Sequence, residues 1–249
     1  MRQRQLLFHY LGHNENVTTS SYGNYLFFAS TRRIVDAFES DTERLKLMEK
    51  IDFKKELKHL YNPSAKKVSA VDVPAMNFLI IDGEGDPNTS QPYRAAAEAL
   101  FSVSYALKFM VKKGKGVDYA VMPLEGLWWV DDMAKFSVER KDEWKWTSMI
   151  MQPKYVSIDD VNVAIDNTRK RKNLTALSKL RFESFNEGES AQIMHIGPYS
   201  SEGPNIAKIH TFILSSGHAL SGKHHEIYLN DPNKTAPTKL KTILRQPMK

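Results

Sequence analysis

The segment KHHEIYLND, residues 223–231, holds the polar side chains best placed for chemistry. If it is an extended strand, alternate side chains share a face, so His224, Glu226 and Tyr228 lie on one side and His225 lies on the other. A carboxylate beside a phenol can supply an acid or a base to a bound ligand. The pattern leaves a second interpretation open, in which Glu226 points to solvent from an edge strand.

Four tryptophans occur in two short strand-like segments. Trp128 and Trp129 are adjacent in LEGLWW, so a regular strand places one on each side, whereas Trp144 and Trp146 share a side. Core filling is one interpretation. The other is an aromatic wall beside a carboxylate, which suits flat aromatic or cationic ligands through stacking and cation–π attraction worth about 0.5–2 kcal/mol per contact.

The segment IMHIGPY adds two weaker candidates, Met194 and His195, at the end of a predicted strand. The glycine and proline that follow are typical turn residues. His195 is therefore either an acid in the site or a core histidine whose ring nitrogens are satisfied by hydrogen bonds.

Metal and phosphate signals are weak. Metal-ligand side chains occur near the C-terminus: His218, His224, His225 and Glu226. Their spacing matches no established metal signature, and the lone GxG of DGEGDP precedes a loop instead of opening a helix. The chain has no cysteine, which excludes thiolate nucleophiles and cysteine-ligated metals. We therefore predict neither a metal nor a cofactor.

Two successive parts of the chain repeat the order strand, strand, long helix, strand, strand. Apolar side chains at helical spacing predict the first helix over residues 92–113, where an aliphatic stripe runs beside an aromatic stripe of Phe101, Tyr105 and Phe109. A face this wide is expected to lie across a sheet. The second helix is predicted over residues 205–217.

The two halves also match in detail. The endings Ile150–Pro153 and Leu244–Pro247 are similar, and aligning LEGLW with HHEIYL makes Glu125 the counterpart of Glu226. We therefore expect an α+β domain built from duplicated β-β-α-β-β halves with pseudo-twofold symmetry. A cleft between the halves is the natural place for a ligand.

Length and composition set the limits of this domain. The 249 residues, 41% of them hydrophobic, are enough for a sizeable core. Residues 1–47 are polar and turn-rich, and we predict that they form a weakly ordered extension before a domain of residues 48–249. No apolar run reaches membrane-spanning length and no secretory signal is convincing, so we expect a cytoplasmic protein without membrane contact.

The net charge of +6 is mild, and its placement favours helix ends. Lys112, Lys113 and Lys115 follow one helical pattern and residues 169–172 close another, where cations complement exposed carbonyl groups. A nucleic-acid surface would more typically interleave basic and aromatic residues on one face. We expect no specific nucleic-acid partner, and the sequence does not specify an oligomeric state.

Several long segments, taken in order, resemble the GyrI-like small-molecule-binding family: PAMNFLIIDGEGDPN, YRAAAEALFSVSYALKF, YAVMPLEGLWW, WKWTSMIMQP, IMHIGPY and HHEIYLNDPNKTAPTKLKTILRQP. The resemblance covers residues 48–249 and is strongest to a stand-alone subfamily that includes cyclopropanoid cyclopropyl hydrolases. It implies two SHS2-like halves with an aromatic cage in the cleft between them.

The resemblance also implies the residues of the site. Glu226 matches the position of a pocket glutamate, and Glu226 and Tyr228 are the expected catalytic residues. The expected ligand-binding residues are Tyr105, Trp128, Trp146, Met194 and His195.

The function implied is binding of flat aromatic or cationic xenobiotics. It includes their detoxification by hydrolytic opening of the cyclopropane in DNA alkylators such as yatakemycin and CC-1065. One alternative is a protein that sequesters such molecules without turnover. Another is the sensor of a transcription regulator, although residues 1–47 lack the helix-turn-helix pattern that a regulator needs.

Overall fold

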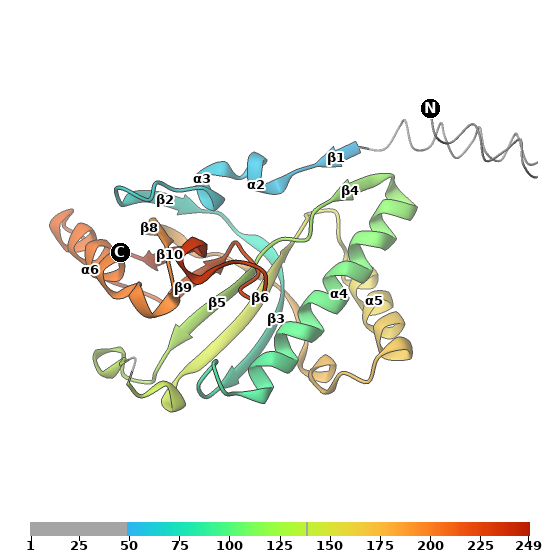
Figure 1. Cartoon of the computed structure of the whole chain (residues 1–249). Coiled ribbons are helices and arrows are strands. Elements are labelled where there is room, and N and C mark those ends of the chain that lie inside the picture. The colour runs from blue at the N-terminus through green and yellow to red at the C-terminus, as the bar shows by residue number, and fades with distance from the viewer. Residues whose placement is uncertain (1–48, 138) are drawn as a thin grey trace, which may run out of the picture. The chain divides into compact units, whose positions relative to one another are not determined.

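A computed structural model describes residues 49–137 and 139–249 of the chain (Figure 1). The predicted N-terminal extension, residues 1–47, lies outside the described residues and stays a prediction. In the described part of the chain, no helix is both long and apolar enough to cross a membrane.

The described residues form strands and helices in the predicted order. The first half contains β2 (Ser69–Val73), β3 (Met76–Glu84), α4 (Gln91–Lys115), β5 (Leu124–Trp129) and β6 (Lys145–Gln152). The second half contains β7 (Arg181–Phe185), β8 (Gly188–Ile196), α6 (Gly203–Ser215), β9 (His224–Tyr228) and β10 (Lys241–Pro247). The helix α5 (Ile158–Arg171) joins the halves and begins with the predicted capping box of Ser157 and Asp160.

Shorter elements precede and connect these halves. The sequence EKIDFKKELKHLYN, residues 49–62, predicts one amphipathic helix, but the structure has β1 (Glu49–Ile51), α2 (Phe53–Glu56) and α3 (Lys58–Tyr61) there instead. The strand β4 (Val117–Tyr119) pairs with β1 in a parallel, two-stranded sheet. Short 3-10 helices lie in the connections: η1 (Met133–Lys135), η2 (Lys141–Glu143), η3 (Thr175–Lys179), η4 (Tyr199–Ser201) and η5 (Pro237–Lys239).

The main sheet is curled and antiparallel, with eight strands among the described residues in the order β2-β8-β10-β9-β5-β6-β3-β7 (Figure 1). The order is symmetric, because exchanging β2 with β7, β3 with β8, β5 with β9 and β6 with β10 gives the same order read from the opposite edge. Each half gives its first strand to the other half, since β2 pairs with β8 and β7 pairs with β3. The strands β5 and β9 meet at the centre.

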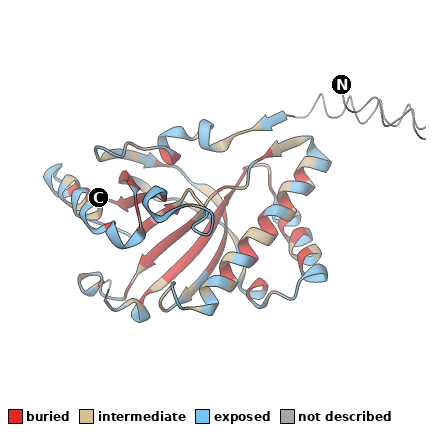
Figure 2. Cartoon of the chain, in the orientation of Figure 1, coloured by how far each residue is buried: buried red, intermediate tan, exposed pale blue. Residues whose placement is uncertain are grey.

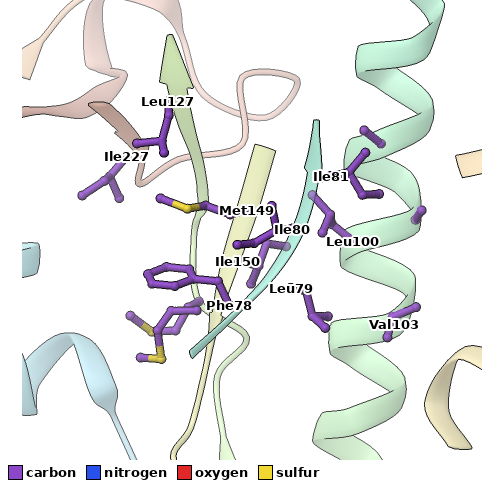
Figure 3. Close-up of a cluster of buried hydrophobic side chains, with 14 of the residues drawn as sticks. Phe78, Leu79, Ile80, Ile81, Leu100, Val103, Leu127, Met149, Ile150 and Ile227 are labelled. Carbon is purple, nitrogen blue, oxygen red and sulfur yellow. The ribbon is translucent and has the colours of Figure 1, made fainter. Parts of the chain in front are cut away.

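The helix α4 covers part of one face of this sheet. Ser90 caps its first turn, and the aliphatic stripe Ala96, Leu100, Val103, Leu107 and Val111 is buried as predicted. Figure 3 shows Leu79 and Ile81 of β3 beside Leu100 and Val103 of α4, with Phe78 on the other side of the strand.

The aromatic stripe of α4 does not lie on the sheet. Tyr105 is 50% exposed and Phe109 is 60% exposed, so the expectation that both stripes pack across the sheet is wrong. The residues of the aliphatic stripe, spaced three or four positions apart, fill the helix–sheet contact and turn this neighbouring stripe away. Figure 2 shows the same contrast, with a buried sheet and exposed outer sides of the helices.

The helix α6 packs on the same face of the second half. Ile209 and Ile213 form a separate apolar cluster with Ile193 of β8 and Leu244 of β10.

The basic residues at the end of α4 pair as expected for a solvated helix terminus, with Lys112 2.8 Å from Asp118 and Lys115 3.0 Å from Asp160.

Candidate functional site

The strand register brings the predicted site residues together on one face of the sheet. Trp128 of β5 is directly opposite both Trp146 of β6 and His224 of β9, and Glu226 is opposite Gly126. Cross-strand partners share a face, and side chains alternate along each strand. Tyr228, two residues beyond Glu226, therefore lies on this face as well, which is the face covered by α4 and α6.

Glu226 and Tyr228 are joined by a short hydrogen bond. The Tyr228 hydroxyl donates to Glu226 Oε2 at 2.7 Å, and Trp128 Nε1 donates to the Tyr228 oxygen at 3.2 Å. His224 Nε2 lies 3.4 Å from Glu226 Oε1. Burial, and next the negative charge of Glu226, raise the pKa of Tyr228 well above its ordinary value, so Tyr228 remains a proton donor.

The position of β9 decides between the two interpretations of Glu226. This strand lies between β10 and β5, and the Glu226 side chain is only 13% exposed. The interpretation of Glu226 as a solvent-facing residue on an edge strand is therefore wrong.

Aromatic rings surround the Glu226–Tyr228 pair. Tyr93 of α4 lies 5.7 Å from Trp128 and 5.2 Å from Trp146 between ring centroids, and Tyr199 lies 5.6 Å from Tyr228. Trp144 contacts Trp128 at 5.6 Å, which confirms that Trp144 and Trp146 share a side. We call the aromatic cluster the set Tyr93, Trp128, Trp144, Trp146, Tyr199 and Tyr228.

Two glycines provide space for the indole rings. A Cβ atom on Gly83, the cross-strand partner of Trp146, would meet that indole at 2.3 Å. A Cβ atom on Gly126 would lie 2.9 Å from Trp128 Nε1. The first glycine of the GxG in DGEGDP therefore allows close approach of a tryptophan ring.

The two central indoles of the aromatic cluster are buried, whereas its edge is open to solvent. Trp128 is 2% exposed and Trp146 is 1% exposed, but Tyr199 is 38% exposed. A groove of about 510 Å³ lies elsewhere, between Lys66–Val68 and α6, and no residue of the aromatic cluster lines it. A ligand of aromatic size can therefore stack against Trp128 or Trp146 only when some of the side chains around them move.

Sequence reasoning missed a second carboxyl group on this face. Glu202 occupies the position before α6, is 5% exposed, and faces the charge of Glu226. Burial, and next the charge of Glu226, raise the pKa of Glu202 well above its ordinary value. Sequence reasoning also missed Tyr93. Tyr93 lies in the first turn of the first predicted helix and Glu202 lies just before the second, so neither belongs to a strand pattern that indicates a site.

Two predicted ligand-binding residues, Tyr105 and Met194, lie away from the aromatic cluster. Tyr105 is on α4, 12 positions beyond Tyr93, and is half exposed. Met194 is opposite Ile243, so it points to the other face of the sheet from Glu226. Their part in ligand binding stays a prediction that this conformation does not support by contact.

His195 lies on the same face as Tyr228 but is held by its own loop. Its Nδ1 lies 3.1 Å from the Asn205 side-chain nitrogen, and its Nε2 lies 3.2 Å from the Pro198 carbonyl oxygen and 3.3 Å from the Ser201 hydroxyl. Both ring nitrogens therefore have partners, in agreement with the interpretation of a satisfied core histidine.

The opposite face of the sheet holds a buried ionic network. His225 Nε2 lies 3.0 Å from Glu125 Oε2 and its Nδ1 lies 3.0 Å from Glu187, which also pairs with Arg245 at 3.0 Å. Glu125 is opposite Ile227, so it and Glu226 point to opposite faces and are not equivalent. The proposed equivalence is wrong because the structural register differs by one residue from the sequence alignment.

The four metal-ligand candidates do not converge on one point, because only His224 and Glu226 lie together. His225 points to the ionic network, and His218 lies 3.8 Å from Glu189, outside the strand. Among residues 49–137 and 139–249, no group of three or more histidine, aspartate or glutamate side chains is arranged to hold a metal ion.

Comparison with known proteins shows the family of this chain. The model of the GyrI-like small molecule binding domain matches residues 66–249. The chain belongs to the GyrI-like family. Two solved structures from Listeria innocua are similar to this GyrI-like chain. An uncharacterized conserved protein is 40% identical, with 80% of this chain and 100% of that chain covered and a TM-score of 0.75.

The second similar structure is a hydrolase from Listeria innocua. It is also 40% identical, covers 81% of this chain and 100% of its own, and gives a TM-score of 0.73. No curated protein matches the sequence closely enough to add to this comparison. The GyrI-like family is a small-molecule-binding family, so a ligand site is expected in this domain. The face that holds Glu226 and the aromatic cluster is our candidate for that site.

Proposed function

We propose that this GyrI-like protein binds flat aromatic or cationic xenobiotics among the rings of the aromatic cluster. The observation that carries the proposal is the hydrogen-bonded Glu226–Tyr228 pair directly beside Trp128 on a buried face. Rings supply stacking and cation–π attraction, and a carboxylate in a water-poor site strengthens attraction for a cation. The symmetric strand order supports a duplicated origin of the two halves, with the pseudo-twofold axis between the paired strands β5 and β9 and the ligand bound over the face that holds Glu226.

We further propose that the protein hydrolyses the cyclopropane of alkylators of the yatakemycin and CC-1065 type. The substrate carries a cyclopropane fused to a cyclohexadienone. Water attacks the less hindered ring carbon, a C–O bond forms, and the strained C–C bond breaks. The electron pair moves through the ring to the carbonyl oxygen, which becomes the oxygen of a phenol. Similarity to a hydrolase at 40% identity supports hydrolytic chemistry.

In this proposal Glu226 accepts a proton from the attacking water. Tyr228, which donates to Glu226 here, holds the carboxylate in place and supplies a hydrogen bond inside the site. Positioned acid–base groups contribute about 10²–10⁴-fold to rate, and an aromatic slot excludes unproductive orientations. Aromatisation to the phenol supplies driving force, so a modest catalyst is sufficient.

The decisive experiment is incubation of the protein with a cyclopropane-bearing alkylator, followed by mass spectrometry of the small molecules. We expect the water adduct in amounts that exceed one equivalent of protein. Tight binding without a water adduct would instead support the second candidate, a protein that sequesters such molecules. That candidate is favoured by the burial of Trp128 and Trp146, because a ligand held between buried rings dissociates slowly.

A further inference from the structure

Glu202 is a buried carboxyl group with no structural task in its own helix. It stands at the N-terminal cap of α6, where a side chain usually accepts hydrogen bonds from the first turn, yet its side chain makes no such bond. Instead, its backbone oxygen accepts hydrogen bonds from the amides of Asn205 and Ile206 at 2.9 and 3.0 Å. The carboxyl group is thus free to serve the buried face.

The surroundings of Glu202 disfavour its charge. Within the described part of the chain, its Oε1 is buried and has no hydrogen-bond partner. The Glu202 amide donates to the Tyr199 carbonyl oxygen at 3.2 Å, the Tyr199 ring lies 5.6 Å from the Tyr228 ring, and Tyr228 donates to Glu226, so Glu202 lies near the Glu226–Tyr228 pair. Burial, and next the charge of Glu226, raise the pKa of Glu202, and Thr242 and Lys141 oppose this effect only in part. A buried carboxylate without adequate donors is costly, and two carboxylates that share one site do not both ionise readily.

We propose that Glu202 and Glu226 hold one proton between them in the resting protein, carried by Glu202, and that Glu202 is the acid that protonates the bound ligand. Two titratable groups whose surroundings separate their protonation states are suited to divide the roles of acid and base. The raised pKa of Glu202 agrees with this division. Glu202 then faces a ligand held in the aromatic cluster as a neutral donor.

The chemical step rests on the proposed function. As water adds to the cyclopropane carbon, Glu226 takes one proton from that water. As the C–C bond breaks, Glu202 gives its proton to the former carbonyl oxygen and is left as a carboxylate. Substrate and water become a phenol that carries a new alcohol. Transfer of the proton from Glu226 back to Glu202 through the shared site restores the resting protein.

The first test reads the proton directly, by infrared difference spectroscopy of the full chain at neutral pH. We expect a band of a protonated carboxyl group that is lost in Glu202→Gln and kept in the control Glu98→Gln, whose side chain is 57% exposed on α4. Glu202→Gln replaces one neutral group by another, so we expect it to fold. A band that persists in Glu202→Gln would overturn the proposal. If the variant unfolds, titration of the wild-type band provides the test instead, and we expect that band to decline only at alkaline pH.

The second test uses single-turnover rates with a cyclopropane-bearing alkylator across pH. The wild-type rate should fall at alkaline pH as Glu202 loses its proton. Glu202→Gln should be slower by about 10²-fold and should lose this alkaline limb, as expected for removal of a general acid. A wild-type rate and pH profile in Glu202→Gln would overturn the acid role. Loss of the infrared band without any turnover by the wild type would reject the proposed reaction and leave the shared proton established.

Discussion

Glu226 and Trp128 perform different tasks on the same buried face. Glu226 is linked to Tyr228 by a 2.7 Å hydrogen bond, whereas Trp128 presents a ring between Tyr93 and Trp144. A base and a stacking surface contribute to different steps, since a base acts in the chemical step and a ring acts mainly in binding. Substitutions at the two positions should therefore separate turnover from affinity.

We expect Glu226→Gln to lower the single-turnover rate by about 10²-fold or more, because the amide cannot accept the proton. Binding of a neutral aromatic ligand should weaken far less. Trp128→Ala should show the reverse, with binding weakened by about 1 kcal/mol or more through the lost ring contact. Single-turnover rates, ligand titration and the melting temperature of both variants provide the measurement. Full turnover by a well-folded Glu226→Gln protein would remove Glu226 from the mechanism.

The close approach of Gly83 to the Trp146 indole leads to a prediction about stability. Gly83→Ala places a methyl group 2.3 Å from the buried indole of Trp146, so we expect a loss of about 1–3 kcal/mol in the free energy of unfolding. Gly114→Ala is the matched control, because a Cβ atom there meets no neighbour within 4 Å and alanine favours a helix. Denaturant unfolding of both variants tests this. Equal stability of the two would show that Trp146 moves aside without cost.

The ionic network attaches the short helix α3 to the sheet. Arg245 of β10 donates to the Leu60 carbonyl oxygen at 2.8 Å, and Tyr61 donates to Glu125 at 2.8 Å. Burial by itself would raise the pKa of Glu187, but the charges of His225 and Arg245 lower it to about 2. Burial would lower the pKa of His225, but its carboxylate neighbours raise it to about 9.

These opposite shifts predict how stability depends on pH. The contribution of Glu187 is present above its unfolded pKa of about 4.5 and is lost as the pH falls toward 2. The contribution of His225 is present below its unfolded pKa of about 6.5 and is lost as the pH rises through about 9. The network should therefore stabilise the fold most between about pH 4.5 and 6.5.

We expect Glu187→Gln to lower the free energy of unfolding by about 3–5 kcal/mol, since it leaves buried positive charge without its partner. Glu183→Gln is the control, because Glu183 pairs with Arg181 while about half exposed, and such pairs contribute about 1 kcal/mol or less. Denaturant titrations at several pH values measure both. A Glu187→Gln protein with unchanged stability and pH dependence would show that the network is dispensable.

At the scale of the whole molecule, the exchange of β2 and β7 ties the two halves together. Each half lacks one strand of its own sheet and receives it from the other. The candidate site depends on both halves, because Trp128 comes from β5 and Glu226 comes from β9. This connection predicts that residues 48–249 resist proteolysis as one unit.

Limited proteolysis of the full chain tests the predicted boundary. We expect early cleavage within residues 1–47, because their composition is polar and turn-rich, followed by a persistent fragment that ends at Lys249. Mass spectrometry of the fragments locates the cuts. If residues 1–47 resist cleavage as strongly as the rest, the prediction of a weakly ordered extension is wrong.

The sequence by itself determined the elements and several of their faces. Period-3.6 and period-2 patterns predicted α4, α6 and the strands of the main sheet, and alternation placed His224, Glu226 and Tyr228 together because every second side chain of a strand shares a face. The aliphatic stripe of α4 was readable for the same reason. Such local periodicity is contained in neighbouring residues.

Only the tertiary structure decided how distant segments meet. Cross-strand register placed Glu125 and Glu226 on opposite faces, and helix packing brought Tyr93 and Glu202 to the aromatic cluster. A shift of one residue in register inverts every side chain of a strand, and it leaves no trace in local periodicity. Local sequence patterns do not predict the exchange of β2 and β7 either, because that exchange depends on burial across the whole sheet.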